Sequence, residues 1–330
     1  MATEGETKTP DEASAPARPR RRLRAIAFHS ILILFNLMLF EAFLRVADFR
    51  DLRVTPEEIR LPYDHDRELG WFPVPGKVTA TGIRINSIGL RDIELAPSAG
   101  KPTIMFVGDS FVYGAGVQTD ERFTEKLRAQ LPDARIVNAG VAAYGTDQEF
   151  LMLRRLWPKI EPNVVVLIVC VDNDHDDNST NSRHGHTLKP YLANVGGKWE
   201  FQGQPVPRSH TWYYYNNWFA NHSAIVRLAI EAFKYLRYPA IDVPDPTNQL
   251  VAMMRDFAEA RGAKFLVGLQ KADPDLEPFL TAQKIPYIRF EGAPIIPGDN
   301  HWNPEGHTMV AERLKAFLAD NGVPGAADKR

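Results

Sequence analysis

Apolar residues follow two different patterns along the chain. One is a single long run at residues 25–46, which is apolar on nearly all faces of a helix. The other begins near Lys101, where short apolar stretches alternate with longer amphipathic stretches. A bilayer core takes roughly 20 apolar residues as a helix, so the first pattern predicts a transmembrane helix. The second predicts an α/β domain.

The charges around the long run indicate its orientation. Arginines crowd on its N-terminal side, at Arg18, Arg20, Arg21, Arg22 and Arg24. The positive-inside rule then places the N-terminus in the cytoplasm and the rest of the chain outside. His29 and Asn36 are costly inside the span, whereas Glu41 lies near its outer end and can pair with Arg45. We therefore expect a single-pass protein of a bacterial inner membrane with an extracytoplasmic domain.

Two other interpretations of this run stay open. One is a cleaved signal peptide, although such peptides have a shorter apolar region of roughly 7 to 15 residues and a small-x-small cleavage site. The other is a buried amphipathic helix of the soluble domain, although that helix would carry a polar face. The composition of residues 25–46 favours the membrane anchor over both.

Composition also divides the rest of the chain. Residues 1–17 hold almost no large apolar side chains, which is typical of disorder. Residues 174–240 are first polar and then aromatic, and a long insertion of this kind is often a lid or binding loop, or a surface excursion packed by its own aromatics. The expected organisation is a disordered basic tail (1–24), the anchor (25–46), an approach segment packed on the domain (47–100), the main domain (101–322) with the insertion at about 174–240, and a C-terminal tail (323–330).

The alternation after Lys101 predicts a parallel sheet with helices on both faces. The expected strands are 103–107, 135–138, 164–171, 264–269 and 286–290. The expected helices include 121–130, 147–156, 248–261 and 304–320. In sheets of this kind, binding sites form at the carboxyl ends of the strands. Candidate site residues should therefore follow these strands directly.

One candidate follows the first strand. The sequence there ends in Gly108-Asp109-Ser110 and continues into FVYGAG. A serine at such a strand end is exposed and has free backbone N–H groups beside it, which suits a nucleophile whose oxyanion must be bound at once. Taken alone, the three residues are a weak signal, because Ser110 could simply cap a helix.

Four blocks of sequence strengthen this signal. GDSFVYGAGV, IVNAGVAAYGTDQ, VVVLIVCVDNDHDDN and GDNHWNPEGH occur in this order, each at the end of an expected strand or at a helix entrance. They resemble the four blocks of the SGNH (GDSL) hydrolase superfamily. The resemblance covers about residues 63–320 and includes the stretches ELGW and INSIGLRD, which often precede the domain in membrane-anchored bacterial members. It implies a flavodoxin-like, three-layer, doubly wound parallel sheet.

The resemblance also implies roles for individual residues. Ser110 is the implied nucleophile and His301 its base, with Asp299 orienting the imidazole. The Ser110 backbone N–H and the Asn173 side chain are implied oxyanion donors. The remaining donor is a backbone N–H at a position where the family usually has glycine and this sequence has Ala143, so the donor requires alanine to adopt the necessary dihedral angles. Gly145 is the fallback.

The last block departs from the commonest family pattern. Many members have Asp-x-x-His, whereas here only Asn300 separates Asp299 from His301. Residues i and i+2 of an extended loop point to the same side, so the carboxylate can still reach the imidazole. This Asp-x-His-Trp form resembles the alginate O-acetyltransferase branch, in which, however, the pair precedes the serine. Asn303 and Pro304 are start signals for the following helix, which would hold the His301 loop.

A metal site is a weaker hypothesis. His175, Asp176, Asp177, His184 and His186 are potential ligands, but their spacing matches no closed zinc pattern. No phosphate-binding glycine loop of the Walker type is present either. We therefore expect no metal and no cofactor.

The net charge and the cysteine content further restrict the function classes to which the chain can belong. The net charge is −2, which gives no global field that would attract nucleic acid. Cys170 is the single cysteine and lies in an apolar run, where a buried, inert thiol is expected rather than a nucleophile.

The sequence thus predicts a serine-dependent esterase that acts on O-acyl esters through an acyl-enzyme on Ser110. The outward-facing domain favours an O-acylated envelope glycan or lipid as substrate. Two alternatives stay open: an O-acyltransferase that modifies an extracytoplasmic polysaccharide, and an inactive module of the same fold that binds glycans.

Overall fold

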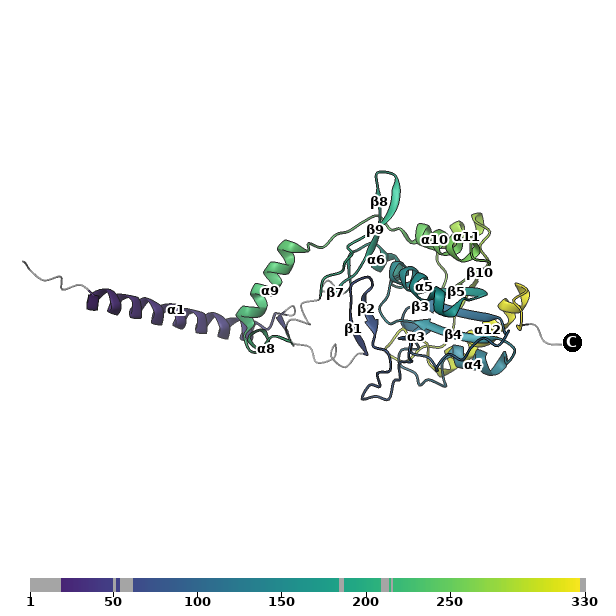
Figure 1. Ribbon diagram of the computed structural model, residues 1–330, viewed down its shortest axis with the longest axis horizontal. Coiled ribbons are helices and arrows are strands. Elements are labelled where there is room, and N and C mark those ends of the chain that lie inside the picture. Colours follow the sequence, from purple (N-terminus) through teal and green to yellow (C-terminus); the bar gives the residue numbers. More distant parts are fainter. Residues whose placement is uncertain are drawn as a thin grey trace, which may run out of the picture.

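A computed structural model describes residues 19–49, 52–53, 62–183, 187–208, 214 and 216–326. A long helix, α1 (Pro19–Ala47), projects away from the α/β domain (Figure 1). Its stretch Arg21–Ala47 is long and apolar enough to cross a membrane, and none of its apolar window is buried in the protein. The helix starts earlier than expected, because the arginine-rich residues up to Arg24 continue it rather than forming a disordered tail. Residues 1–18 lie outside the described residues.

The domain is built on a five-stranded parallel sheet in the order β11-β10-β5-β3-β4. The strands are β3 (Thr103–Gly108), β4 (Arg135–Gly140), β5 (Val164–Val169), β10 (Lys264–Leu269) and β11 (Tyr287–Arg289). Numbered along the chain, this order is 2-1-3-4-5 when read from β4, which is the flavodoxin-like arrangement. The expected fold class is therefore confirmed. The chain reverses its winding direction between β3 and β5, and in such folds the ligand site lies at this switch point.

Helices cover both faces of the sheet. α5 (Thr146–Ile160), α10 (Thr247–Glu259) and α11 (Leu276–Ala282) share a core with Met105 and Val107. α4 (Phe123–Gln130) and α12 (Pro304–Asp320) share a second core with Ile104 and Phe106. Successive side chains of β3 thus alternate between the two cores, as the period of a strand requires. All six residues of β3 are buried, so helices on both faces are needed to cover them.

The segment before the domain is part of the core rather than only lying on it. β1 (Tyr63–Asp66) and β2 (Gly70–Pro73) form an antiparallel hairpin. Leu69, Trp71 and Leu90 are buried in the core that contains α5. At the other end of the chain, Val323 and Ala326 are buried in the second core, so the domain continues beyond residue 322.

The insertion after β5 has secondary structure of its own. It contains α6 (Asp174–Asn178), β6 (Ser182–Arg183), β7 (Thr187–Leu188), β8 (Tyr191–Val195), β9 (Lys198–Gln202), α8 (Trp218–His222) and α9 (Ala224–Arg237). Lys189 forms a fully buried ion pair with Asp147 at the start of α5, which ties the insertion to the domain. Burial raises the pKa of Asp147 to about 6, although the Lys189 charge opposes the shift. In Figure 1, α8 and α9 stand apart from the sheet, at the end of α1 that lies nearest to the domain.

Candidate active site

Ser110 lies where the chain leaves β3 at the carboxyl edge of the sheet. It is the first residue of the short helix α3 (Ser110–Tyr113), and Asp109 rather than Ser110 caps this helix. The helix packs closely on β4, since a Cβ on Gly140 would approach the Tyr113 backbone nitrogen to 2.1 Å. Gly140 therefore allows α3 to pack tightly on the strand end. Ser110 remains partly accessible to solvent.

The loop before α12 brings a histidine and an aspartate to Ser110. The Nε2 atom of His301 lies 2.8 Å from Ser110 Oγ, and His301 Nδ1 lies 2.6 Å from Asp299 Oδ1. An ionised carboxylate can only accept hydrogen bonds, so Nδ1 carries the hydrogen. In the neutral ring Nε2 is then the acceptor and faces the serine hydroxyl. The two contacts have the geometry of a catalytic triad.

The protein holds this loop at both ends. The Ile296 backbone N–H donates to the His301 carbonyl oxygen at 2.9 Å, and the Asn303 side chain caps α12 by accepting from the Gly306 N–H at 2.8 Å. The Asp299 carboxylate also accepts the His301 backbone N–H, which lowers the pKa of Asp299 together with the imidazole contact. The carboxylate therefore stays ionised and available to the imidazole through the neutral pH range.

Ala143 adopts the backbone conformation that a glycine would take more easily. Its φ is 67°, in the left-handed region. This conformation costs a non-glycine residue on the order of 1–2 kcal/mol, and such strain tends to occur at functional sites. The Ala143 N–H makes no hydrogen bond to another described residue. By contrast, the N–H of the fallback, Gly145, donates to Gln148 Oε1 at 3.4 Å, so Ala143 is the better candidate donor.

Asn173 occupies a different local setting from the expected one. β5 ends at Val169, two residues earlier than expected, and Asn173 immediately precedes α6. Its side-chain Nδ2 donates to Asp177 Oδ2 at 2.6 Å, and no hydrogen bond between Asn173 and Ser110 is present among the described residues. The sequence feature that could have identified Asp177 as the partner of Asn173 is their spacing of four residues in the acidic run DNDHDDN.

Asp109 is a part of the site that the sequence analysis did not single out. Its side chain is buried, with Oδ1 accepting from the Phe111 N–H at 2.9 Å and Oδ2 lying 3.1 Å from Ser110 Oγ. Burial raises the pKa of Asp109, which favours the neutral acid. In the structure the Ser110 hydroxyl is the donor of this contact, so Asp109 Oδ2 and His301 Nε2 are two acceptors available to the same hydrogen. The sequence feature that could have identified Asp109 is its position directly before the serine in Gly-Asp-Ser.

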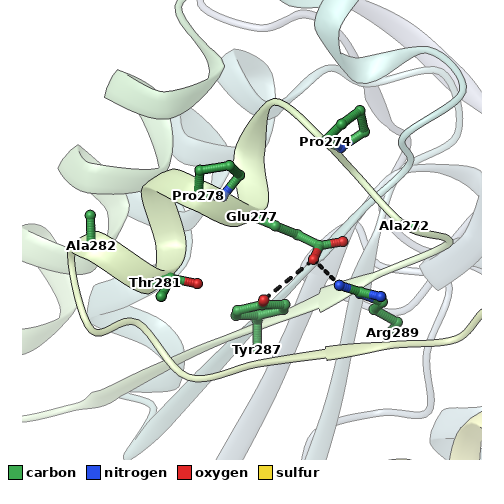
Figure 2. A pocket seen from close by; sticks show the side chains of 8 residues that line it. All are labelled: Ala272, Pro274, Glu277, Pro278, Thr281, Ala282, Tyr287 and Arg289. Atoms are coloured by element: carbon green, nitrogen blue, oxygen red, sulfur yellow. Dashed lines mark hydrogen bonds and ion pairs between the residues drawn. The ribbon is translucent and has the colours of Figure 1, made fainter.

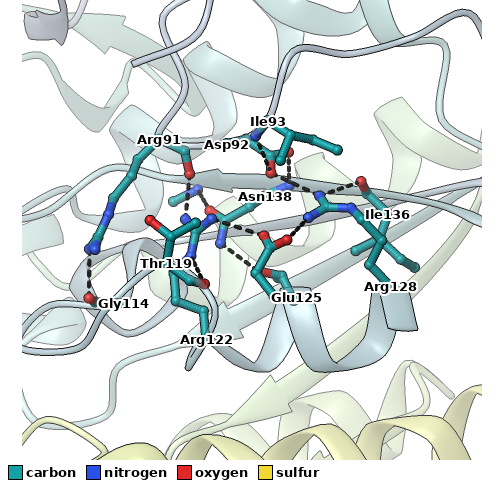
Figure 3. Close-up of polar contacts among 12 residues, drawn as sticks. Arg91, Asp92, Ile93, Gly114, Thr119, Arg122, Glu125, Arg128, Ile136 and Asn138 are labelled. Carbon is teal, nitrogen blue, oxygen red and sulfur yellow. Dashed lines mark hydrogen bonds and ion pairs between the residues drawn. The ribbon is translucent and has the colours of Figure 1, made fainter. Parts of the chain in front are cut away.

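A buried arginine holds the end of helix α3. Arg91 donates to the carbonyl oxygens of Tyr113, Gly114 and Val117, at 3.1, 2.6 and 2.8 Å. Figure 3 shows Arg91 reaching Gly114, while the neighbouring Asp92 contacts both Arg128 and Asn138. The last carbonyl groups of a helix lack intrahelical partners, so a buried cation there satisfies them. The segment around INSIGLRD thus helps to hold α3.

His175 links three segments beside the site. Its Nδ1 lies 2.6 Å from Asp245 Oδ2, and its Nε2 lies 2.8 Å from Asp273 Oδ2. Both nitrogens face carboxylates, so both must carry hydrogen, and these contacts, that to Asp245 first, raise the pKa of His175 to about 9. His175 is therefore engaged as a cation rather than free to bind a metal. No group of metal-binding geometry occurs among the described residues, and His184 and His186 lie outside them.

This bridge predicts a pH-dependent stability. The folded pKa of His175 is about 9 and its ordinary value 6.5, so the stabilisation is complete below pH 6.5 and is lost as the pH rises through 9. The contribution is about 3 kcal/mol of unfolding free energy. Urea denaturation of the full chain in detergent, at about pH 6 and about pH 10, should show a larger loss for the wild type than for His175→Gln, which cannot titrate. An equal loss in both proteins would contradict the assignment.

A surface depression lies elsewhere on the domain, between α11 and β11. Figure 2 shows its charged groups, in which Glu277 contacts both Tyr287 and Arg289. These groups satisfy one another, and none of Ser110, Asp299 and His301 lines the depression. It is therefore separate from the triad and presents no unpaired charge to a ligand.

The fold and the site together define a class of protein. A flavodoxin-like sheet carries a serine at its switch point, and a histidine and an aspartate from the loop before the last helix complete a chain of contacts to it. This is the arrangement implied by the resemblance to the SGNH hydrolases, which thus extends from the sequence blocks to the strand order and the triad.

Comparisons with known proteins gave matches among solved structures only. No family model matches the sequence, and no curated protein matches it. Among solved structures, the chain is similar to TesA, with 17% identity, a TM-score of 0.38 and coverage of 66% of this chain and 98% of TesA. It is similar to the psychrotrophic esterase EstA from Pseudoalteromonas sp., with 11% identity, a TM-score of 0.39 and coverage of 67% and 98%. It is also similar to the acetyl xylan esterase AlAXEase, with 11% identity, a TM-score of 0.37 and coverage of 66% and 99%.

Proposed function

We propose that this protein is a serine esterase that hydrolyses O-acyl esters through an acyl-enzyme on Ser110. The observation that carries the proposal is the contact chain from Ser110 Oγ to His301 Nε2, at 2.8 Å, and from His301 Nδ1 to Asp299 Oδ1, at 2.6 Å. An acidic group beside one imidazole nitrogen and a hydroxyl beside the other are what a histidine general base needs.

The reaction follows from these positions. Ser110 Oγ attacks the ester carbonyl carbon while His301 Nε2 takes the hydroxyl proton, and the carbonyl oxygen becomes an oxyanion. The tetrahedral intermediate collapses by breaking its bond to the alcohol oxygen, which receives the proton from His301. Water then attacks the acyl-enzyme with His301 again as base, and the acid leaves as Ser110 regains its proton. Asp299 stabilises the imidazolium in both halves and stays ionised.

Three donors are proposed for the oxyanion: the backbone N–H groups of Ser110 and Ala143, and the side-chain amide of Asn173. An amide nitrogen carries two hydrogens, so the bond from Asn173 to Asp177 leaves one for the substrate. The same bond fixes the amide in advance, which is what oxyanion stabilisation requires. The strained φ of Ala143 supports its assignment, because the strain has no evident structural benefit.

Solvent access favours hydrolysis over transfer to a sugar. The side chains of Asp299 and His301 are 44% and 23% exposed, so water can reach the base that would activate it. An acyltransferase must keep water from the acyl-enzyme, and the described residues provide no cover over this pair. A purely binding module of this fold would not require the three residues to contact one another. For these reasons we rank the esterase above both alternatives.

The proposed membrane anchor determines which substrates the domain can reach. We propose that α1 spans the inner membrane once with its arginines in the cytoplasm, so that the domain faces the cell envelope. O-acylated glycans and lipids of the envelope are then the accessible esters. The direct test of the function is to incubate the full chain in detergent with O-acetylated oligosaccharides and follow free acetate. Hydrolysis releases acetate without an acceptor, whereas loss of the donor ester only on addition of an acceptor sugar, with the acetyl group recovered on that sugar and no free acetate formed, would favour the transferase.

The oxyanion assignment gives a sharper prediction. Asn173→Ala should lower kcat on the same ester by on the order of 100- to 1,000-fold, because one fixed donor to the oxyanion is lost. KM should change little, since the contact matures only in the transition state. Asp177→Asn is a matched variant that keeps the volume but replaces the charged acceptor of the Asn173 amide by a weaker, neutral one, and it should give a smaller loss. Normal turnover per folded molecule in Asn173→Ala, together with a lowered melting temperature, would make Asn173 structural.

A further inference from the structure

Helix α9 presents its polar face to the protein and its apolar face to the outside. Arg227 is buried on the inner face and donates to the Ala220 carbonyl oxygen at 2.7 Å, and Glu231 accepts from Tyr214 Oη at 3.0 Å. On the outer face, Phe233 and Leu236 are 66% and 84% exposed. A helix of a water-soluble domain normally does the reverse and buries its apolar stripe. The outer face of α9 is therefore built to meet an apolar environment.

The preceding helix extends this apolar surface. Trp218 and Phe219 in α8 are 67% and 65% exposed, and Tyr235 in α9 is 74% exposed. Large exposed apolar patches mark surfaces that contact a membrane or another protein. In the last turn of α9, Arg237 is an exposed basic residue, whereas Lys234 pairs with Glu231 at 3.1 Å on the inner face.

The location of α9 identifies the environment. Glu41 of α1 accepts hydrogen bonds from Ser223 Oγ at 2.9 Å, the Ala224 N–H at 2.8 Å and the Ile225 N–H at 3.0 Å. It thereby caps the start of α9, as a carboxylate at a helix N-terminus should. Glu41 precedes the end of α1 at Ala47 by six residues, or about 9 Å along the helix axis.

Two further contacts reinforce this junction. The Arg45 guanidinium pairs with Glu41 at 2.7 Å and contacts the His222 carbonyl oxygen, while Leu44 packs against Ala224. Figure 1 shows α9 leaving the end of α1 obliquely rather than continuing its direction. The first turn of α9 is thus held level with the outer end of the proposed membrane span, and the helix runs sideways from it.

We propose that α8 and α9 lie in the headgroup region of the outer leaflet, with their apolar face toward the acyl chains. This inference rests on the proposed membrane anchoring by α1. Tryptophan is enriched at the membrane–water boundary, and helices with basic residues on one side and Phe or Leu on the other bind there. The lipid surface is favoured over a second copy of the chain, because α9 contacts α1 at the end of the proposed span, where apolar residues of α1 such as Phe43 are also exposed. The arrangement also explains why a charged residue, Glu41, lies within the apolar run of α1. Its carboxylate accepts hydrogen bonds from the start of α9.

The proposal can be tested by fluorescence quenching in bilayers. The full chain is reconstituted at one molecule per lipid nanodisc, with a thiol-reactive fluorophore placed at Leu236→Cys, Leu34→Cys or Val195→Cys. Leu34 lies within α1, and Val195 is an exposed residue of the β8–β9 hairpin that serves as the matched control. Cys170 is buried and will not compete for the label. Lipids with a nitroxide near the carbonyl region of the acyl chain, and aqueous iodide, serve as the two quenchers.

The expected result is that the nitroxide lipid removes most of the fluorescence at position 236, while iodide removes most of it at position 195. Strong iodide quenching at 236 with lipid quenching preserved at 34 would overturn the surface proposal and leave the anchor in place. Absence of lipid quenching at both 34 and 236 would instead reject the anchoring itself. Protection of position 236 from both quenchers would show that protein covers this face, which also contradicts the proposal.

Discussion

Replacement of Ser110 with alanine is expected to lower ester turnover by on the order of 10⁵- to 10⁶-fold. The variant loses the oxygen atom that forms the acyl-enzyme, so the reaction can no longer pass through that intermediate. The loss should appear in kcat, because substrate binding does not need the hydroxyl. A residual rate above that of uncatalysed hydrolysis is expected, since the oxyanion donors still act on a water attack. The measurement is initial-rate kinetics on an activated ester, per mole of folded protein.

His301→Ala is the matched control for this variant. Ser110 and His301 act as one unit, so the double variant should be no slower than either single variant. Additive losses would mean that the two residues act independently, against the 2.8 Å contact between Ser110 Oγ and His301 Nε2. Thermal denaturation should change little for Ser110→Ala, because Asp109 and not Ser110 caps α3. Retention of more than a small fraction of turnover in Ser110→Ala would reject the proposed nucleophile.

Asp299→Asn should give the second-largest loss, on the order of 10³- to 10⁴-fold in turnover. An asparagine can present its amide N–H to His301 Nδ1 and so stabilise the tautomer whose Nε2 carries hydrogen and cannot accept the serine proton. The aspartate is 44% exposed, so solvent screens its charge, and the tautomer effect should dominate over the loss of electrostatic stabilisation. The measurement is kcat/KM over the neutral range of pH.

Asp299→Ala separates the two effects. It removes the charge but leaves no amide to select the wrong tautomer, so it should lose less activity than Asp299→Asn. If both variants keep normal turnover, the orienting role belongs to another carboxylate, with Glu305 at the start of α12 the next candidate. If the alanine variant is the slower one, the charge itself matters more than the tautomer.

Local signals were enough to predict the sheet, and the resemblance implied that Ser110, His301 and Asp299 come together. The run of buried β-branched residues in β5 is readable because a strand covered on both faces must be apolar throughout. The start of α12 was readable from Asn303 and Pro304, which cap and open the helix in the structure. The order of the four blocks then placed Ser110 and His301 at one edge of the sheet, where the structure brings them together.

The features that could not be predicted depend on contacts between residues far apart in the sequence. Nothing near Arg91 indicates that it caps helix α3, because its acceptors lie more than twenty residues away. From the sequence, His175 was only a possible metal ligand. Its partners Asp245 and Asp273 could not be recognised, because they are separated from it by 70 and 98 residues. The helix α9 was not predicted, and only its contact with Glu41 locates it beside α1.

The insertion after β5 contacts both the candidate active site and the end of α1. Its first helix supplies Asp177, which holds the amide of the preceding Asn173, while its last helix is capped by Glu41 of α1. One inserted segment therefore connects the proposed oxyanion donor with the anchor. In the proposed anchoring, this connection sets how the domain stands above the membrane, and so which envelope esters would reach Ser110.

The central claim is that Ser110 is an activated nucleophile, and covalent labelling tests it most directly. A fluorophosphonate reacts with a serine hydroxyl only when a base and an oxyanion site activate it. The full chain is incubated with the probe, digested and analysed by mass spectrometry. The account predicts one adduct, on the peptide that contains Ser110, which is absent in Ser110→Ala and forms far more slowly in His301→Ala. An unlabelled Ser110 in the folded protein, or an adduct that forms equally fast without His301, would contradict it.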